Sequence, residues 1–277
     1  MPKPTSTSIR LARTVAMAVV IGIGLFNLYQ AAANWTLSDA SAYWNAALRL
    51  RDGMPLYLSP ANVDASEVYR YAPWFAWATV PFTWLPQQLA GGLWSAALLA
   101  ASALALVPMV RAREWLLVAL FGPILVGISA VGNVQPLLIA ALMWTVERRS
   151  GPLWVGVVSS LKIFPILFVA VYLGRREWAR AAVAIAVAAA LWAPALLYDL
   201  RGYTTDAGQA ASLFALPAVW AVVVGAGVVV TLRLAGTRFA WLAAATTVVL
   251  ALPRLFVYDV TYQMVGAVTG ARHPGAR

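Results

Sequence analysis

Two cations within apolar segments could bind an anionic ligand. Lys162 lies in the middle of the apolar stretch from Leu153 to Leu173, and Arg254 lies in another apolar run. A lysine at the centre of a membrane helix costs about 2.5–3.5 kcal/mol on an insertion scale, and such residues usually mark a functional site. Because an ammonium is a compact charge suited to phosphate, we expect these cations to bind an anion. The structural alternative is pairing with an acid, for example of Arg254 with Asp259.

Asp39 is the candidate general base. It follows the first apolar run, and a general base must reach the proton of an attacking hydroxyl group. The alternative is an acid that is favoured only by the dipole at a helix N-terminus, an effect of about 0.3–1 kcal/mol. Both interpretations stay open on the position of this residue alone.

The segment that contains Asp39 predicts a helix over residues 39–51, with Ser38 as its N-cap and Gly53 at its end. Tyr43 shares one face of this helix with Ala47 and Leu50. We therefore expect an amphipathic helix that lies along the membrane surface.

Further polar and aromatic residues could contact a substrate. Asn133 and Gln135 interrupt two apolar runs, either as part of a tight turn or as amides that bind a polar ligand. Tyr43 and Tyr71 could stack on sugar faces, although aromatic residues at a membrane interface more often form the belt that anchors the spans.

The composition predicts an integral membrane protein. Of 277 residues, 62% are hydrophobic and 11% are charged, whereas soluble domains carry about 25% charge. The chain has no cysteine and one histidine, His273, which argues against thiolate metal sites, cysteine nucleophiles and histidine-rich metal sites. The net charge of +10 comes from short basic clusters between apolar runs, which is how membrane orientation is encoded, so we expect no nucleic-acid partner.

The apolar segments predict an all-α, polytopic transmembrane helix bundle with about eight to ten membrane segments. We expect one multi-span domain over residues 1–277, with a first span at 14–33, an outer loop at 34–72 that contains the interfacial helix, and a tail at 259–277. The remaining membrane segments are expected at 73–86, 88–110, 115–131, 134–146, 152–174, 178–197, 211–232 and 239–258.

Arginine clusters predict the orientation. Placing them on the cytoplasmic side together with the N-terminus requires that segments 73–86 and 152–174 each enter and leave the membrane on the same side. Both segments contain prolines that break a helix and expose backbone groups, as expected of broken or re-entrant segments that line a cavity. The alternative, simple full spans, would place several arginine clusters outside. On the broken arrangement, the polar residues converge on the outer face.

The ordered motifs resemble glycosyltransferase family 87, which belongs to the GT-C class. The resemblance rests on Ser38-Asp39 with Tyr43, Gly53-Met-Pro-Leu-Tyr57, Tyr69-Arg-Tyr-Ala-Pro73, Gly132-Asn-Val-Gln-Pro136 and Ser160-Leu-Lys-Ile-Phe-Pro165. It covers roughly residues 14–260. Members are expected to be longer at the C-terminus, and they tend to have an Asp-His pair where this chain has Tyr258-Asp259-Val260.

The resemblance implies transfer of mannose or arabinofuranose from a polyprenyl-phosphate donor to a glycolipid or envelope glycan at the outer face of the cytoplasmic membrane. Asp39 matches the base of the family, and Lys162, with Arg254, would bind the donor phosphate. Tyr43, Tyr71, Asn133, Gln135 and Asp259 are then candidate substrate-binding residues. A monophosphate donor needs no metal or other cofactor. We expect a single displacement that inverts the anomeric carbon.

Two rival functions stay open. Broken helices and a buried cation also suit a transporter or lipid flippase, but such proteins often show two related halves, and neither the Asp39 nor the Lys162 environment is repeated. A shortened relative could instead be a non-catalytic membrane partner of another glycosyltransferase.

Overall fold

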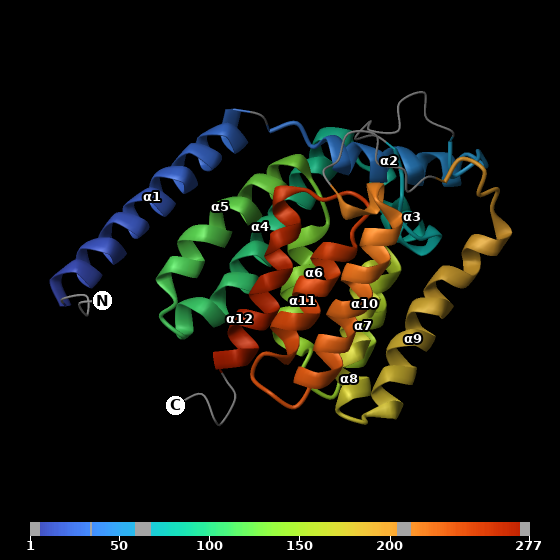
Figure 1. Cartoon of the computed structure of the whole chain (residues 1–277). Coiled ribbons are helices and arrows are strands. Elements are labelled where there is room, and N and C mark those ends of the chain that lie inside the picture. The colour runs from blue at the N-terminus through green and yellow to red at the C-terminus, as the bar shows by residue number, and fades with distance from the viewer. Residues whose placement is uncertain (1–5, 34, 59–67, 204–211, 272–277) are drawn as a thin grey trace.

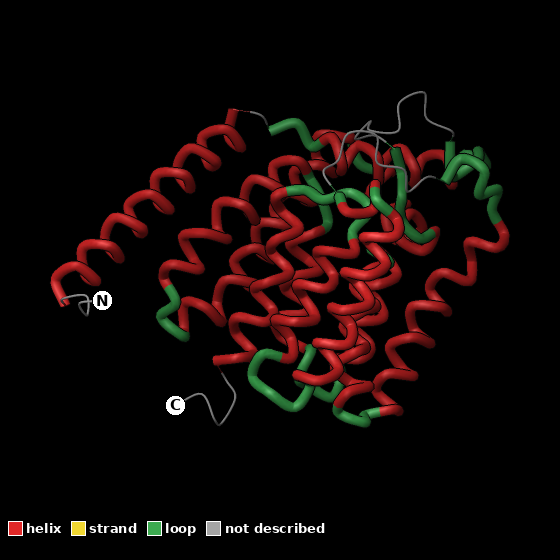
Figure 2. Tube along the Cα trace, viewed as in Figure 1, coloured by secondary structure: helices red, strands yellow, loops and turns green. Residues whose placement is uncertain are grey.

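The structure is a computed structural model that describes residues 6–33, 35–58, 68–203 and 212–271. Within these ranges every regular element is a helix, and loops gather at two opposite edges (Figure 2). The α-helices are α1 (Ser6–Ala33), α2 (Ser38–Arg51), α3 (Pro73–Thr79), α4 (Gln87–Arg111), α5 (Trp115–Val131), α6 (Gln135–Thr145), α7 (Gly151–Leu161), α8 (Val169–Gly174), α9 (Trp178–Trp192), α10 (Pro217–Leu234), α11 (Ala240–Ala251) and α12 (Gln263–Ala271). Five 3-10 helices connect them: η1 (Val80–Trp84), η2 (Phe164–Phe168), η3 (Ala193–Leu197), η4 (Leu213–Ala215) and η5 (Val257–Tyr262). The single histidine, His273, lies outside the described residues.

The helices form a membrane bundle, as the sequence predicts. Three of the described helices, at 87–111, 178–197 and 217–234, are long and apolar enough to cross a membrane, and shorter apolar helices lie between them. Large apolar side chains point away from the bundle, among them Leu196 and Leu197 at 85% and 87% exposed. Lipid is the solvent that such a surface requires.

Small residues let the helices approach closely. A side chain at Gly156 of α7 would come within 2.7 Å of the Ala184 carbonyl oxygen on α9, and one at Gly266 of α12 would reach the Leu242 backbone. Gly24 of α1 meets α5 in the same way. Such contacts are typical of helix packing in membranes, where backbone proximity takes the place of a hydrophobic driving force.

The segment that carries Lys162 is a re-entrant hairpin. α7 ends at Leu161, the chain turns at Lys162, and η2 and α8 return to the edge where α7 began. The Tyr172 hydroxyl, near the end of the hairpin, donates to the Val146 carbonyl oxygen just before its start, at 2.9 Å. The expected break is confirmed, and it places Lys162 at the tip of the hairpin.

The segment after the first loop is broken as well. α3 changes to the 3-10 helix η1 at Val80, directly before Pro81, and both elements pack against α2. Arg51 of α2 donates to the Thr83 carbonyl oxygen at 3.1 Å. This segment therefore starts and ends at the edge of the bundle where α2 lies.

The arginine clusters share the opposite edge of the bundle (Figure 1). The guanidinium carbons of Arg111 and Arg148, from two clusters, each lie 5.6 Å from the centre of the Trp144 ring. Arg175, from the third cluster, donates to the Ala235 carbonyl oxygen beside the fourth at 2.7 Å. These four arginine clusters are thus separated from the edge that carries α2, where Arg49, Arg51 and Arg70 lie.

α2 crosses the top of the bundle in Figure 1, and its buried face includes Tyr43 and Ala47. The amphipathic helix is therefore present, but the expected N-cap is wrong. Leu37 caps the helix in a left-handed conformation (φ 51°), and Ser38 is already helical. The Leu37 N–H bonds instead to the Ala130 carbonyl oxygen of α5 at 3.1 Å, so a tertiary contact fixes the start of this helix.

The expected tail at 259–277 is also corrected. Residues 259–262 belong to η5, and Gln263–Ala271 form α12, which packs on α11. Tyr262, Met264 and Val265 are fully buried. The segment continues the bundle because its apolar residues face α11, a pattern too short to stand out in the sequence.

Candidate active site

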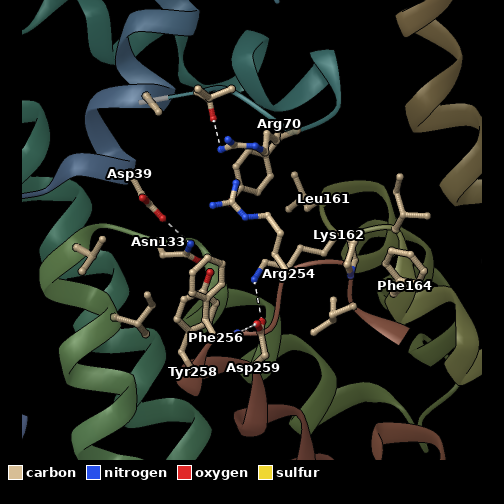
Figure 3. A pocket seen from close by; sticks show the side chains of 18 of the residues that line it. Asp39, Arg70, Asn133, Leu161, Lys162, Phe164, Arg254, Phe256, Tyr258 and Asp259 are labelled. Atoms are coloured by element: carbon tan, nitrogen blue, oxygen red, sulfur yellow. Dashed lines mark hydrogen bonds and ion pairs between the residues drawn. The ribbon is translucent and has the colours of Figure 1, made fainter. Parts of the chain in front are cut away.

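A cavity of about 420 Å³ opens beneath α2. It is bounded by α2, the irregular segment 68–72 before α3, the α5–α6 turn, the tip of the α7–η2 hairpin and the segment from α11 to η5. Its charged lining residues are Asp39, Arg70, Lys162, Arg254 and Asp259. Figure 3 shows Asp39 on one side and the side chains of Arg70, Lys162 and Arg254 converging toward the space opposite it. The cavity therefore joins an acid to three cations that come from separate segments.

The Asp39 carboxylate is held by the α5–α6 turn. The Asn133 amide donates to Asp39 Oδ2 at 2.5 Å, and Asn133 Oδ1 accepts the Gln135 N–H at 2.9 Å. Gly132 sets this geometry. Its φ is +83°, and a side chain there would come within 2.7 Å of the Ala40 side chain. Only glycine lets the turn and the first turn of α2 approach so closely.

Burial raises the pKa of the Asp39 carboxyl above its ordinary value of 3.8. The Asn133 hydrogen bond opposes this effect, and so does the attraction of Lys162, Arg70 and Arg254. A raised pKa makes the carboxylate a stronger base. The three cations favour the ionised form, which is the form that accepts a proton.

The Lys162 ammonium pairs with an acid, which is the structural alternative that the sequence left open. Its ammonium lies 3.4 Å from Asp259 Oδ1, and 4.7 Å from the centre of the Tyr258 ring. The other Asp259 oxygen accepts the Phe256 N–H at 2.9 Å. Asp259, the acid that the sequence offered as an alternative partner of Arg254, pairs with Lys162, which lies 97 positions away in the chain.

The Lys162–Asp259 contact leaves the lysine able to bind a ligand. At 3.4 Å it is longer than the 2.7–2.9 Å typical of charge-assisted hydrogen bonds. An ammonium has three donors, and the Lys162 side chain is 15% exposed, against 2% for Asp259. Asp259 thus orients the Lys162 ammonium, and the remaining N–H donors of the ammonium are left for a ligand in the cavity.

Arg70 and Arg254 complete the positive wall. The Arg254 guanidinium carbon lies 5.3 Å from the centre of the Phe256 ring, and Arg70 donates to the Val68 carbonyl oxygen at 3.2 Å. The Arg254 side chain extends toward Arg70 in Figure 3. With Lys162, the lining holds three cations and, counting Asp39 and Asp259, two carboxylates. The surplus of positive charge suits a ligand with one negative charge.

The two predicted tyrosines line the cavity. The Tyr43 hydroxyl donates to the Tyr71 hydroxyl at 3.0 Å and accepts the Val134 N–H at 3.3 Å. The rings meet edge to face with their centres 5.1 Å apart. They form a fixed aromatic wall beside Asp39.

Gln135 does not line the cavity. It is fully buried and donates to the Thr261 hydroxyl at 3.2 Å, which ties the start of α6 to η5. Its expected contact with substrate is therefore replaced by a contact that supports the site.

Sequence reasoning missed Arg70, Phe256 and Tyr258 as lining residues. Arg70 had a signal, because it is a cation between two tyrosines in the loop that carries the candidate base. The two aromatic residues had none, since a ring beside a buried cation cannot be told from an ordinary apolar residue in the sequence. Among the described residues no group of three or more His, Cys, Asp or Glu could hold a metal ion.

Comparison with known families identifies the chain. The model of glycosyltransferase family 87 matches residues 69–257, a range that includes Arg70, Asn133, Lys162 and Arg254, whereas Asp39 and Asp259 lie outside it. Neither the comparison with curated proteins nor that with solved structures gave a match. The matched range covers most of the bundle and all or part of four of the five segments around the cavity, and the chain therefore belongs to glycosyltransferase family 87 and is a membrane glycosyltransferase.

Proposed function

We propose that the enzyme transfers mannose or arabinofuranose from a polyprenyl-phosphate donor to a glycolipid or envelope glycan. The observation that carries this proposal is the position of the Asp39 carboxylate in the same cavity as Lys162, Arg70 and Arg254. A glycosyl donor of this class is a phosphodiester with one negative charge, which matches the positive surplus of the lining. Apolar lining residues such as Leu161 and Phe164 offer a surface for the start of the polyprenyl chain.

The chemistry is a single displacement. Asp39 takes the proton of the acceptor hydroxyl, whose oxygen forms the new bond to the anomeric carbon. The bond from that carbon to the phosphate oxygen breaks, and its electron pair leaves on the phosphate, whose charge becomes more negative. Lys162, Arg70 and Arg254 stabilise this growing charge, a contribution that is often the largest in enzymatic catalysis. Attack from the face opposite the phosphate inverts the anomeric configuration.

The proposed orientation follows from the two edges of the bundle. Arginine-rich loops face the cytoplasm in membrane proteins. When the edge that carries the four arginine clusters is placed on the cytoplasmic side, the N-terminus is cytoplasmic. The cavity under α2 then opens on the outer face of the cytoplasmic membrane. A lipid-linked donor reaches this face with its chain still in the bilayer.

The test is transfer by the purified full chain in lipid nanodiscs with radiolabelled polyprenyl-phosphomannose and decaprenyl-phosphoarabinofuranose. Wild-type protein should form a glycosidic product of inverted configuration, identified by NMR. Asp39→Asn should lower kcat by about a hundredfold or more while the donor still binds. Asp52→Asn, a change to an exposed carboxylate that does not line the cavity, is the matched control.

Equal amounts of product from wild type and from Asp39→Asn would show that Asp39 is not the general base. Lys162→Ala should weaken donor binding far more than it changes the yield of inserted protein. Lipid translocation without any glycosidic product would identify a flippase, and absence of both activities would indicate a non-catalytic partner.

A further inference from the structure

A second cavity, of about 240 Å³, lies on the other side of α2. Leu37, Ala40, Ser41 and Trp44 line it, at the spacing of one helix face. Asp39 lines the first cavity but not the second. The first turns of α2 thus separate the two cavities, and the ring of Tyr43 contacts both.

The lining of the second cavity is uncharged and mostly apolar, with several polar groups. It combines four aromatic residues, two amides and three Ser or Thr hydroxyl groups: Tyr43, Trp44, Phe82, Trp94, Gln87, Gln88, Thr36, Ser41 and Thr79. None of the described residues that line it carries a charge, in contrast to the first cavity. Aromatic faces pack against the C–H groups of a sugar ring, while amides and hydroxyls exchange hydrogen bonds with its hydroxyl groups. This chemistry fits a neutral carbohydrate and not a phosphate.

One buried donor in this lining is unused. The Trp44 indole N–H is buried and has no hydrogen-bond partner among the described residues. The other tryptophan of the cavity differs, because the Trp94 N–H donates to the Gly132 carbonyl oxygen at 2.7 Å. A buried donor without a partner costs about 1–3 kcal/mol.

We infer that the second cavity binds a sugar unit of the acceptor, at a distance from the unit that receives the new sugar. The inference rests on the proposed function. A volume of about 240 Å³ is smaller than the roughly 300–1,000 Å³ of sites for drug-sized ligands, so it suits one sugar ring and not a whole glycolipid. A helix about 10–12 Å across separates the two cavities. The acceptor is therefore an oligosaccharide, and the enzyme extends an existing glycan.

The test is direct binding without donor, so that it does not depend on catalysis. Isothermal titration calorimetry of the full chain in nanodiscs would compare alkyl glycosides that carry one, two or three units of mannose or of arabinofuranose. In one of the two series, the three-unit glycoside should bind wild type at least tenfold more tightly than the one-unit glycoside. Ser41→Leu fills the second cavity and should abolish this gain, and Trp44→Phe, which removes the N–H and makes the aromatic face smaller, should reduce it.

Asn45→Leu is the matched control, because it adds a similar side chain to the same helix outside both cavities. The Asn45→Leu variant should still bind the three-unit glycoside at least tenfold more tightly than the one-unit glycoside. Equal affinities for the one-unit and three-unit glycosides, absence of binding by every glycoside, or an undiminished gain in both Ser41→Leu and Trp44→Phe would overturn the inference. Failure of the proposed function would appear separately, as the absence of sugar transfer from the polyprenyl donors.

Discussion

The Asn133 amide donates to the Asp39 carboxylate at 2.5 Å across 94 positions of the chain. The hydrogen bond connects the α5–α6 turn to α2, so the candidate base is oriented by a turn that belongs to the bundle. A hydrogen bond to the ionised form of a carboxyl lowers its pKa, which offsets part of the effect of burial on Asp39. Asn133 therefore sets both the position and the protonation of the base.

The pH dependence of transfer should report this contact. Asp39 must be ionised to act, so the rate falls as the pH drops through its raised pKa. Asn133→Ala removes the hydrogen bond, and Asn133→Asp adds a like charge, so both should raise that pKa further. The acid limb of the kcat profile should move to higher pH in the order wild type, Asn133→Ala, Asn133→Asp. An unchanged limb in both variants would contradict the role of Asp39 as base; Asn45→Ala on α2 is the control.

The close approach at Gly132 should be required for activity. Alanine at this position is strained by the φ of +83° and would lie 2.7 Å from the Ala40 side chain. We expect Gly132→Ala to destabilise the protein by about 1–3 kcal/mol and to lower kcat further, because α2 must move away from the turn. Thermal unfolding in nanodiscs and initial rates would measure the two effects.

Gly92→Ala is the matched control for Gly132→Ala. No atom lies within 4 Å of a side chain added at Gly92, and its backbone is helical. Its unfolding temperature should stay the same or rise, because alanine is favoured over glycine in a helix by about 1 kcal/mol. Full activity of Gly132→Ala would show that the approach of α2 to the turn is not needed.

The sequence predicts much of this site because its strongest signals are local. Proline positions correctly locate the breaks at Pro81 and Pro165, and the α5 helix spans the expected residues 115–131. Lys162 stands out because it is a charge within an apolar segment, whereas Asp39 stands out by its place after the first apolar run and by the family resemblance. Both line the same cavity, as the proposed chemistry requires.

The remaining features depend on contacts between distant segments. Lys162 pairs with Asp259 because the hairpin tip meets η5, and no local pattern shows that meeting. Gln135 carries the same polar signal as Asn133 two residues away, yet it points to Thr261 and not to the cavity. Only the tertiary arrangement separates a residue that binds substrate from one that supports the site.

The contacts that join the two ends of the α7–η2–α8 hairpin, at the edge of the bundle opposite α2, should hold Lys162 in position. Arg175 binds Glu147 through two hydrogen bonds, at 2.9 Å and 3.1 Å, and Trp241 donates to the same carboxylate. We expect Glu147→Gln to cost about 1 kcal/mol, since the partly exposed pair is screened by solvent. Thermal unfolding would measure this loss. Asp199→Asn, which breaks an exposed pair with Arg201, should leave stability unchanged, and an equal loss in both variants would contradict the role of the network.

Removal of the Asp259 carboxylate should strengthen binding of the leaving group. Asp259 neutralises part of the Lys162 charge, and Asp259→Asn leaves three cations opposite one carboxylate. Polyprenyl phosphate should then bind about tenfold more tightly, since charges about 4 Å apart interact by several kcal/mol in a partly buried site. Because the product leaves more slowly, KM for the donor and kcat should both fall. Calorimetry with polyprenyl phosphate, and with neutral polyprenol as the control ligand, would measure the change. Weaker binding of the phosphate would show instead that Asp259 contacts the substrate directly, because loss of a hydrogen-bond acceptor would then outweigh the relief of repulsion.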